Sequence, residues 1–251
     1  MPVTEAMRGR RKRAVTGLKR GLILDAARAV FERDGLDGAS LRAIAAEAGY
    51  TPAALYFHFD SKEALYAEVL GQSLDALKAS VDAGVTGAAS PAGRFAAAAL
   101  AFFDFYATHP RDLDLGFYLF RGGMRPHGLG RDRDKALNEA LEAALWPILE
   151  AAEAMGADEA TARLLMADTF AHAVGVLLMM HTQRIRMFGL APRALMERYV
   201  ETELMKLTSP DGRGNPLLEG KGRVRGRPLD TEAKTSPPSR LRGLLKIEPS
   251  S

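Results

Sequence analysis

Apolar residues recur with the period of a helix along most of the chain. Ahead of the first glycine-rich segment, RDGLDGAS, five of them fall at i, i+3, i+4, i+7 and i+8: Ile23, Ala26, Ala27, Val30 and Phe31. This spacing places them on one face of an amphipathic helix, which we predict over about residues 17–34. Between residues 21 and 207 no alternating run bounded by turns indicates a strand. The pattern therefore predicts an all-α protein.

Two short helices with their own start signals should follow. Ser40 can cap a helix that ends at Gly49, and Thr51 can cap the next one. Pro52 stands at the first position of that helix, where its missing N–H costs nothing. A fourth helix begins at residue 60 or 61. The tight turn between the two short helices gives them the spacing of a helix-turn-helix, in which the second helix enters the major groove of DNA.

The stretch TPAALYFHF, residues 51–59, holds three aromatic rings and a histidine in a segment too short for a core of its own. Leu55 and Phe59 lie one turn apart and would pack inward. Tyr56 and His58 would then lie outward or at the flank, where they could donate hydrogen bonds to phosphate oxygens. The alternative is that all three rings belong to the core and His58 is merely solvated.

Further helices are expected after the break at SPAG, residues 90–93. An aromatic-rich helix ends near His109, and a short segment around Phe117 leads to a glycine-rich loop over 122–130.

The last third of the body should hold three helices. The first contains Trp146-Pro147, where the proline should kink it by removing a backbone hydrogen bond. The others span about 157–188 and 192–207. From Ser209 onward Gly, Pro, Ser and charged residues dominate, which predicts a disordered tail.

Composition narrows the class of protein. The 251 residues are 47% hydrophobic and include no cysteine, so a sizeable core is available while disulfides and thiolate zinc sites are excluded. The first residues lack the apolar stretch of a secretory signal, and the run AVGVLLMM at 173–180 falls far short of the ~20 residues of a membrane span. We expect a cytoplasmic protein with no membrane partner, no cofactor and no metal site.

Net positive charge is concentrated at the two ends of the chain. Residues 1–20 hold seven Lys or Arg and one carboxylate, and residues 207–251 hold nine cations and five carboxylates. The middle of the chain, 21–206, carries a net charge of −7 although the whole chain carries +3. Basic ends could meet a polyanion, so double-stranded DNA is the first partner to consider.

The run from Ile23 to Leu70 resembles the DNA-binding domain of the TetR family of bacterial transcriptional regulators. The shared pattern, F…G…S-L-R-x-I-A-x-x-A-G-Y-T-P-x-x-L-Y-x-H-F-x-S-K-x-x-L, extends over four helices and about a fifth of the chain. The resemblance implies an N-terminal three-helix helix-turn-helix domain and a larger C-terminal helical domain for ligand binding and dimerisation. It also implies a homodimer formed mainly by the last two helices.

Carried over residue by residue, the resemblance implies contacts with DNA. Backbone contacts would come from Ser40, Thr51, Tyr56, His58 and Lys62, and base-edge or groove contacts would come from Arg42, Pro52 and Ala53. Arg42 serves equally well as a phosphate contact or as a base reader.

With this resemblance, the chain divides into four parts. We expect a disordered basic arm over 1–16 and a helix-turn-helix domain over 17–65. An effector-binding and dimerisation domain would cover 66–207, and a disordered basic tail 208–251.

Aromatic and methionine side chains in the middle of the chain suit an apolar or aromatic effector. The candidates for such a pocket are Phe103, Tyr106, Phe117, Trp146, Met166 and Phe170. The alternative for each is an ordinary core position. His172 and His181 are nine residues apart, so they do not share a helical face as a metal-binding pair would.

Two stripes of side chains could form the dimer interface. Ala167, Ala171, Val174 and Leu178 form one on the long helix, and Leu195, Tyr199 and Val200 form one on the last. Two stripes from each subunit would make a four-helix interface.

The tail carries one short motif of its own. Arg225, Gly226, Arg227 and Pro228 resemble an AT-hook, in which both arginines enter the narrow minor groove of A·T-rich DNA. The alternative is a solvated, arginine-rich linker.

These observations predict a ligand-responsive repressor that binds a near-palindromic operator as a homodimer and is released by a small apolar or aromatic effector. An alternative is an architectural or activating protein whose basic arm and tail bind A·T-rich DNA. An enzyme is not supported, because the sequence has no glycine-rich phosphate loop after a strand and no catalytic cluster.

Overall fold

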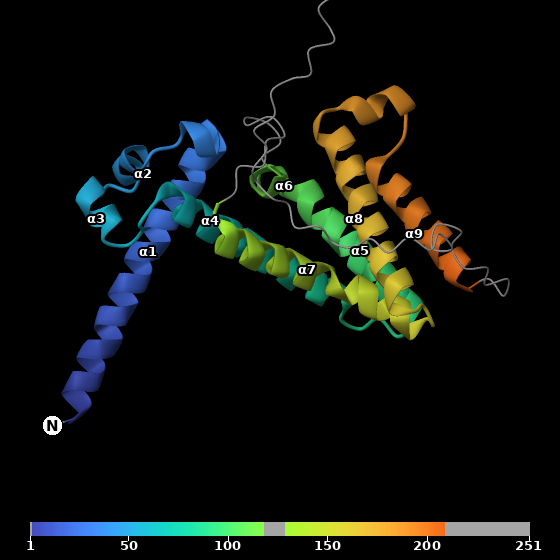
Figure 1. Cartoon of the computed structure of the whole chain (residues 1–251), viewed down its shortest axis with the longest axis horizontal. Helices are drawn as coiled ribbons and strands as arrows, with labels where there is room; N and C mark the ends of the chain where they lie inside the picture. Colours follow the sequence, from blue (N-terminus) through green and yellow to red (C-terminus); the bar gives the residue numbers. More distant parts are fainter. Residues whose placement is uncertain (1, 118–128, 209–251) are drawn as a thin grey trace, which may run out of the picture. The chain divides into compact units, whose positions relative to one another are not determined.

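The computed structural model describes residues 2–117 and 129–208, and the regular elements within them are helices (Figure 1). The expected all-α fold is confirmed. In chain order the elements are α1 (Pro2–Gly38), α2 (Leu41–Glu47), α3 (Pro52–Tyr56), α4 (Lys62–Val85), α5 (Pro91–Thr108), α6 (Pro110–Phe117), α7 (Arg131–Ala154), α8 (Glu159–His181), the short 3-10 helix η1 (Arg184–Phe188) and α9 (Pro192–Thr208). The tail from residue 209, with Arg225 to Pro228, lies outside the described residues.

The first helix is much longer than predicted. α1 begins at Pro2 instead of near residue 17, so the expectation of a disordered arm over 1–16 is wrong. The physical reason is local: Met, Arg, Lys and Ala, which fill much of this segment, are good helix formers, and no proline interrupts it after Pro2. The other end was predicted well, because Gly35, with φ of 69°, kinks the helix one residue after the expected end.

The caps of the next three helices are as predicted. The Ser40 side chain accepts a hydrogen bond from the Ala43 N–H at 3.1 Å, and Thr51 accepts one from Ala54 at 3.3 Å. Ser61 does the same for α4. Because α4 then runs unbroken to Val85, it crosses the domain boundary expected at residues 65 and 66. The helix-turn-helix region is therefore continuous with the rest of the chain through a helix rather than a linker.

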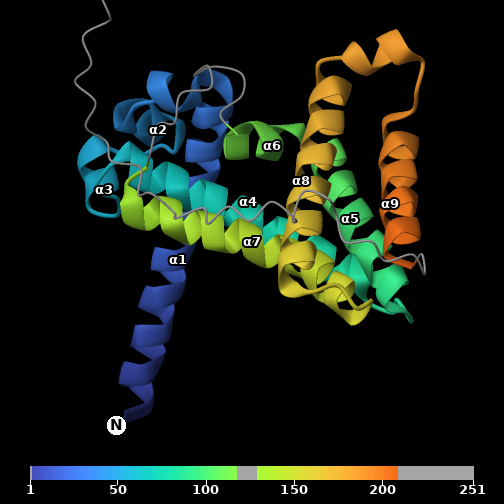
Figure 2. The same cartoon turned by 45° about the vertical axis from the view of Figure 1, so that its right-hand side comes forward.

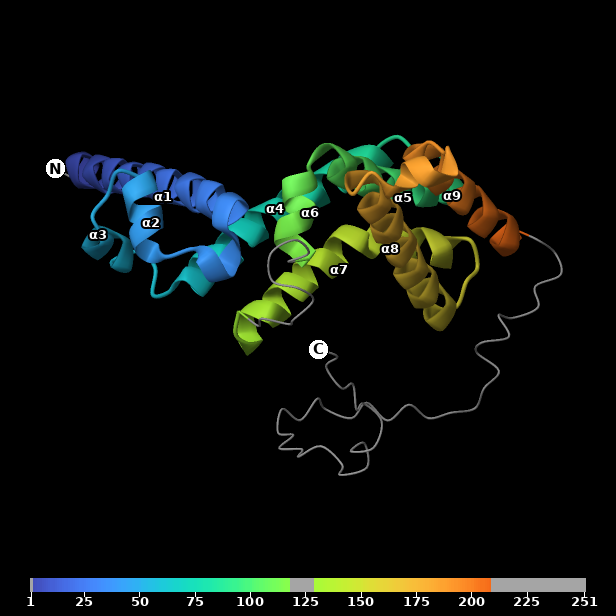
Figure 3. The same cartoon turned by 90° about the horizontal axis from the view of Figure 1, so that it is seen from above.

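A compact apolar core holds the first helices together. Ile23, Val30, Ile44, Leu55 and Leu65 are fully buried, and they come from α1, α2, α3 and α4. Figure 3 shows α2 and α3 along one side of α1. Since Leu55 is the one buried residue of α3, the orientation of that helix depends on a single side chain.

The larger part of the fold is built on α4 and α7, which run side by side (Figure 2). Helix α5 packs against both, and α8 packs against α5, α7 and α9. The close contact between α4 and α5 occurs at Gly84, where an added Cβ would lie 2.7 Å from the Ala101 Cβ. α7 continues through Pro147 as one helix from Arg131 to Ala154.

The helix expected over 157–188 is shorter in the structure. α8 ends at His181, and Gln183 adopts a left-handed conformation with φ of 61° before η1 begins. The predicted end is wrong. The apolar spacing continues through Ile185 and therefore indicated a longer helix, but this buried residue lies in η1.

Helix α6 contacts α1, α4 and α5. The Arg28 guanidinium of α1 pairs with Asp112 of α6 at 2.8 Å, and the Tyr66 hydroxyl of α4 donates to the Leu115 carbonyl at 2.7 Å. A polar link therefore joins α1 and α4 of the helix-turn-helix region to α6.

Candidate nucleic-acid interface

The turn between α2 and α3 depends on Gly49. Its φ of 70° is the left-handed conformation that glycine adopts without strain. The Tyr50 N–H donates to the Ala45 carbonyl at 2.8 Å and closes the end of α2. Thr51 then starts α3 directly, so the two helices are held at a fixed angle by local hydrogen bonds.

One face of α3 is solvent-exposed, and it holds the residues expected to meet DNA. Thr51, Pro52 and Ala53 at its N-terminal end are exposed, and Tyr56 is 58% exposed. Leu55 and Phe59 are buried, so the predicted division between inward and outward side chains is confirmed. The alternative in which all three rings are core is excluded for Tyr56. Small side chains and a positive helix end together allow close approach to an anionic groove.

Ser40 and Arg42, at the start of α2, are also exposed. The Arg42 guanidinium makes no ion pair or hydrogen bond within residues 2–117 and 129–208. Its charge is therefore available to a phosphate or a guanine.

Phe57 is a surface residue that the sequence interpretation missed. It is 87% exposed, the largest exposed fraction among the large apolar side chains described, and its ring meets His58 edge to face at 5.6 Å. The signal was present in the sequence: once Leu55 and Phe59 define the inward face, the residue midway between them must point elsewhere. An aromatic ring in this position can contact a sugar or a thymine methyl group.

Lys62 has partners inside the protein. Its Nζ donates to the Leu36 carbonyl at 2.8 Å and lies 3.4 Å from the carbonyl oxygens of Asp37 and Ala39. It therefore caps the end of α1, a contact made across more than twenty residues of sequence. A phosphate contact from Lys62 stays a prediction, but in this structure the ammonium group stabilises the loop that leads into α2.

The residues proposed for an effector pocket differ in burial, as far as the structure describes them. Phe103 and Tyr106 are buried in the core, and burial raises the pKa of the Tyr106 hydroxyl. Met166 and Phe170 are half-buried on α8, Trp146 is exposed on α7, and the side chain of Phe117 lies outside the described part. Phe170 meets Phe102 edge to face at 5.8 Å.

The hollow that Trp146 lines is formed mostly by charged residues. It is open to solvent, has a volume of about 640 Å³ and lies between α4 and α7. Four carboxylates and two cations line it: Asp82, Glu139, Glu142, Glu150, Lys78 and Arg163. Such a lining does not suit an apolar effector.

Helix α8 is apolar and only partly covered by the rest of the chain. It has the length and the mean hydropathy, 1.5 over its most apolar 18 residues, of a helix that could cross a membrane, yet it packs against three helices of the same unit. Only 28% of that window is buried. Ala167 and Ala171 of the expected dimer stripe are exposed, and Val174 and Leu178 are half-buried.

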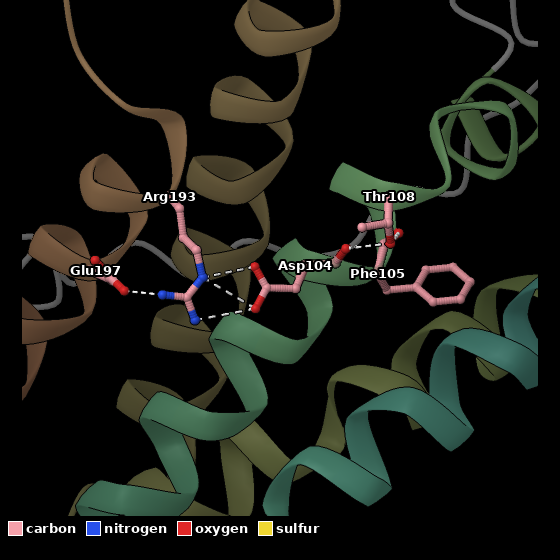
Figure 4. A network of polar contacts seen from close by, with 5 residues as sticks. All are labelled: Asp104, Phe105, Thr108, Arg193 and Glu197. Atoms are coloured by element: carbon pink, nitrogen blue, oxygen red, sulfur yellow. Dashed lines mark hydrogen bonds and ion pairs between the residues drawn. The ribbon is translucent and has the colours of Figure 1, made fainter.

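Helix α9 is held to the fold by polar and aromatic contacts. Arg193 pairs with Asp104 of α5 at 3.1 Å and with Glu197 one turn along α9 (Figure 4). The His172 ring of α8 stacks on Tyr199 of α9 with 4.2 Å between the centroids. Leu195 and Tyr199 of the second expected stripe are half-buried, whereas Val200 is buried and cannot contribute exposed surface.

Comparison with known proteins identifies the first part of the chain. Residues 23–69 match the family model described as bacterial regulatory proteins, TetR family. The HTH-type transcriptional regulator RutR of Escherichia coli K12 is 46% identical over 67 residues, which cover 27% of this chain and 31% of RutR. The chain thus matches about a third of the length of this curated relative.

Solved structures with the same fold cover more of the chain. The transcriptional regulator FadR from Bacillus subtilis, solved in complex with stearoyl-CoA, has a TM-score of 0.56 at 17% identity and covers 72% of this chain and 95% of its own. A TetR-like transcriptional regulator from Rhodococcus sp. RHA1 has a TM-score of 0.55 at 18% identity, with 74% and 95% covered. The helix-turn-helix part of the chain, residues 23–69, is therefore similar in sequence to the TetR family of bacterial regulatory proteins, and the later helices share the fold of the solved TetR-like regulator.

Proposed function

We propose that this protein is a DNA-binding transcriptional regulator, a cytoplasmic repressor that binds a near-palindromic operator as a homodimer. The observation that carries the proposal is the exposed face of α3, with Thr51, Pro52, Ala53 and Tyr56 outward over a buried Leu55. A short helix of this kind, fixed by caps at both flanking turns, presents its N-terminal end to the major groove.

The homodimer part of the proposal is supported by α8. Only 28% of the most apolar window of α8 is buried, and incompletely covered apolar side chains are unfavourable in a monomer. The small side chains of Ala167, Ala171 and Gly175, four residues apart and all exposed, allow a second helix to approach closely. A two-fold dimer would place two α3 helices on two half-sites of one operator.

We place the response to an effector in the region of α5, α6 and α8. Phe102, Tyr106 and Phe170 form an aromatic cluster there. The Arg28–Asp112 and Tyr66–Leu115 contacts join the neighbouring α6 to α1 and α4. An apolar or aromatic ligand that rearranges the cluster would change the position of α6 and so of the DNA-binding helices. FadR, which shares the fold, was solved with stearoyl-CoA.

Tyr56→Phe tests the interface with a change of one oxygen atom. We expect weaker binding to every DNA fragment that the protein recognises, by a similar factor of about 3 to 10, because a phosphate contact carries no sequence information. The melting temperature of the variant is the control and should equal that of the wild type, because Tyr56 is 58% exposed. Fluorescence anisotropy titrations measure DNA binding, and unchanged binding by Tyr56→Phe would remove Tyr56 from the interface.

A further inference from the structure

The N-terminal half of α1 projects beyond the packed body of the protein. Ile23 is the first buried residue of the helix, and none of the side chains described between residues 7 and 22 is buried. The segment from Pro2 to Leu22 is therefore a helical extension about 30 Å long, at 1.5 Å per residue (Figures 1 and 2). Most side chains described on this segment are exposed, so its surface is free to meet another molecule.

One face of the extension combines cations with apolar side chains. At 3.6 residues per turn, six exposed residues fall within about a third of the helix circumference: Arg8, Arg11, Val15, Leu18, Lys19 and Leu22. The three cations make no ion pair or hydrogen bond within the described ranges. Leu18 is 69% exposed, so this face, which we call the α1 basic face, is not covered by the protein itself.

The order of side chains on the α1 basic face favours DNA over a lipid surface. A helix that lies on a membrane separates its apolar residues from its cations, on opposite faces. Here Arg8, Arg11 and Lys19 share one face with Val15, Leu18 and Leu22, without such a separation. A nucleic-acid backbone offers phosphates to the cations and sugar surfaces to the apolar side chains.

The extension starts next to the helix-turn-helix. The Arg20 guanidinium lies 4.5 Å from the centre of the Phe59 ring, just beyond the end of α3, and also pairs with Glu68 of α4. These contacts fix the direction in which α1 leaves the body. DNA bound at α3 would therefore lie close to the base of the extension.

We propose that the α1 basic face is a second DNA-contacting surface, which docks as a rigid helix along the phosphate backbone beside the operator half-site. The inference rests on the proposed DNA binding by α3. It assigns to Arg8, Arg11 and Lys19 a contribution to affinity that is independent of sequence, since phosphate contacts add binding energy without base readout.

Two adjacent arginines distinguish a docked helix from a flexible basic arm. Arg11 lies on the α1 basic face, whereas Arg10 lies well outside it, and both are exposed. For the full chain on a mixed-sequence duplex of roughly 40 base pairs, Arg11→Ala should lower the slope of log K against log salt by about one. Arg10→Ala removes the same charge and should leave the slope nearly unchanged. Equal losses for the two variants would contradict the helical mode and support a flexible arm.

Gly17 gives an independent test of helicity. An added Cβ at Gly17 meets nothing within 4 Å, so Gly17→Ala fits the structure and favours the helix. We expect binding to tighten by up to about fivefold in Gly17→Ala and to weaken in Gly17→Pro, which breaks the extension ahead of the first buried residue. An unchanged melting temperature in both variants would show that the body remains folded. If Gly17→Ala bound DNA no more tightly than the wild type, and Gly17→Pro no more weakly, the proposal would be overturned.

The same titrations separate this inference from the proposed function. Suppose that the wild type binds a selected operator, and that Arg11→Ala binds both the operator and the mixed-sequence duplex as tightly as the wild type does. The α1 basic face then has no role in DNA binding, while the role of the helix-turn-helix is unaffected. If the wild type binds no DNA sequence selectively, the proposed function itself fails. Binding to anionic phospholipid vesicles that Arg11→Ala abolishes, with DNA binding intact, would assign the face to lipid and overturn the proposal.

Discussion

At the scale of single residues, the proposed DNA-binding surface is simple: one buried leucine anchors α3, and its exposed N-terminal end carries small side chains. Ala53 occupies the exposed N-terminal end of that helix, where its methyl group would approach a base edge. Because it contributes no hydrogen bond of its own, a larger polar residue there would introduce new base readout.

We expect Ala53→Asn to change which operator is preferred. An asparagine can form a bidentate pair with adenine, worth about 1–3 kcal/mol of discrimination against the wrong base. Selection of bound fragments from a random DNA pool with wild type and variant measures the change. The same motif recovered with both proteins would show that Ala53 does not face the bases.

Lys62 is expected to contact a DNA phosphate, but in the structure its ammonium group donates to backbone carbonyl groups of the protein. Its contacts with the carbonyl groups of Leu36, Asp37 and Ala39 indicate a structural contribution. We expect Lys62→Met to lower the free energy of unfolding by about 1–3 kcal/mol, since it leaves carbonyl groups at the end of α1 without their charged donor. Chemical denaturation measures this. Unchanged stability, together with a slope of log K for DNA binding against log salt that is smaller by about one, would show that Lys62 contacts a DNA phosphate instead.

His172 gives the α8–α9 contact a dependence on pH. Burial lowers the pKa of its imidazole, an effect partly opposed by a hydrogen bond with the Leu195 backbone and reinforced by Arg198. The unfolded histidine takes up its proton at about pH 6.5, and the folded one only at lower pH. Because the unfolded state then binds more protons, the free energy of unfolding should decrease as pH falls below about 6.5.

His172→Phe keeps a ring stacked on Tyr199 and removes the titrating group. Thermal unfolding at a series of pH values should show a smaller loss of stability on acidification in the variant than in the wild type. Identical pH profiles would show that His172 does not carry the effect.

At the scale of elements, the sequence predicted best what is decided locally. The caps at Ser40 and Thr51 and the turn at Gly49 depend on residues at most five positions apart, and the structure has them as expected. The outward face of α3 followed from the same local pattern. The extent of α1 and the contacts of Lys62 could not be predicted in this way, since the first is a balance of weak propensities and the second joins residues far apart in sequence.

The break after α8 was missed for a related reason. Ile185 keeps the apolar spacing of the helix. The helix nevertheless ends before it, because Gln183 adopts a left-handed conformation that is uncommon for glutamine and could not be predicted from the residue type. The effector residues stay a prediction, because aromatic side chains at helical spacing pack into a core as readily as they line a pocket. Phe103 and Tyr106 are buried, which fits either outcome.

Helix α8 should be the element on which dimerisation depends. An arginine at Ala171 would place a large charge in the middle of its exposed apolar stripe, so we expect Ala171→Arg to shift the protein from dimer to monomer and to weaken operator binding at least tenfold. Ala154→Arg, at an exposed alanine of α7, is the matched control. Sedimentation equilibrium would settle the point, and a variant that remains dimeric would place the interface elsewhere.

At the scale of the whole molecule, the net positive charge and the proposed DNA-reading helix lie in different regions of the chain. The chain has basic ends and a middle with a net charge of −7, while the exposed face of α3 lies in that middle part. We therefore expect the ends to raise affinity for any DNA and the helix-turn-helix to choose the sequence.

The most direct test of this account is selection of bound genomic fragments with the full chain and, in parallel, with a version that ends at Leu207. The account predicts that both recover the same short near-palindrome, with lower overall affinity for the shorter protein. Scattered A·T-rich tracts, or a palindrome that disappears with the tail, would contradict it and assign sequence recognition to the segment around Arg225.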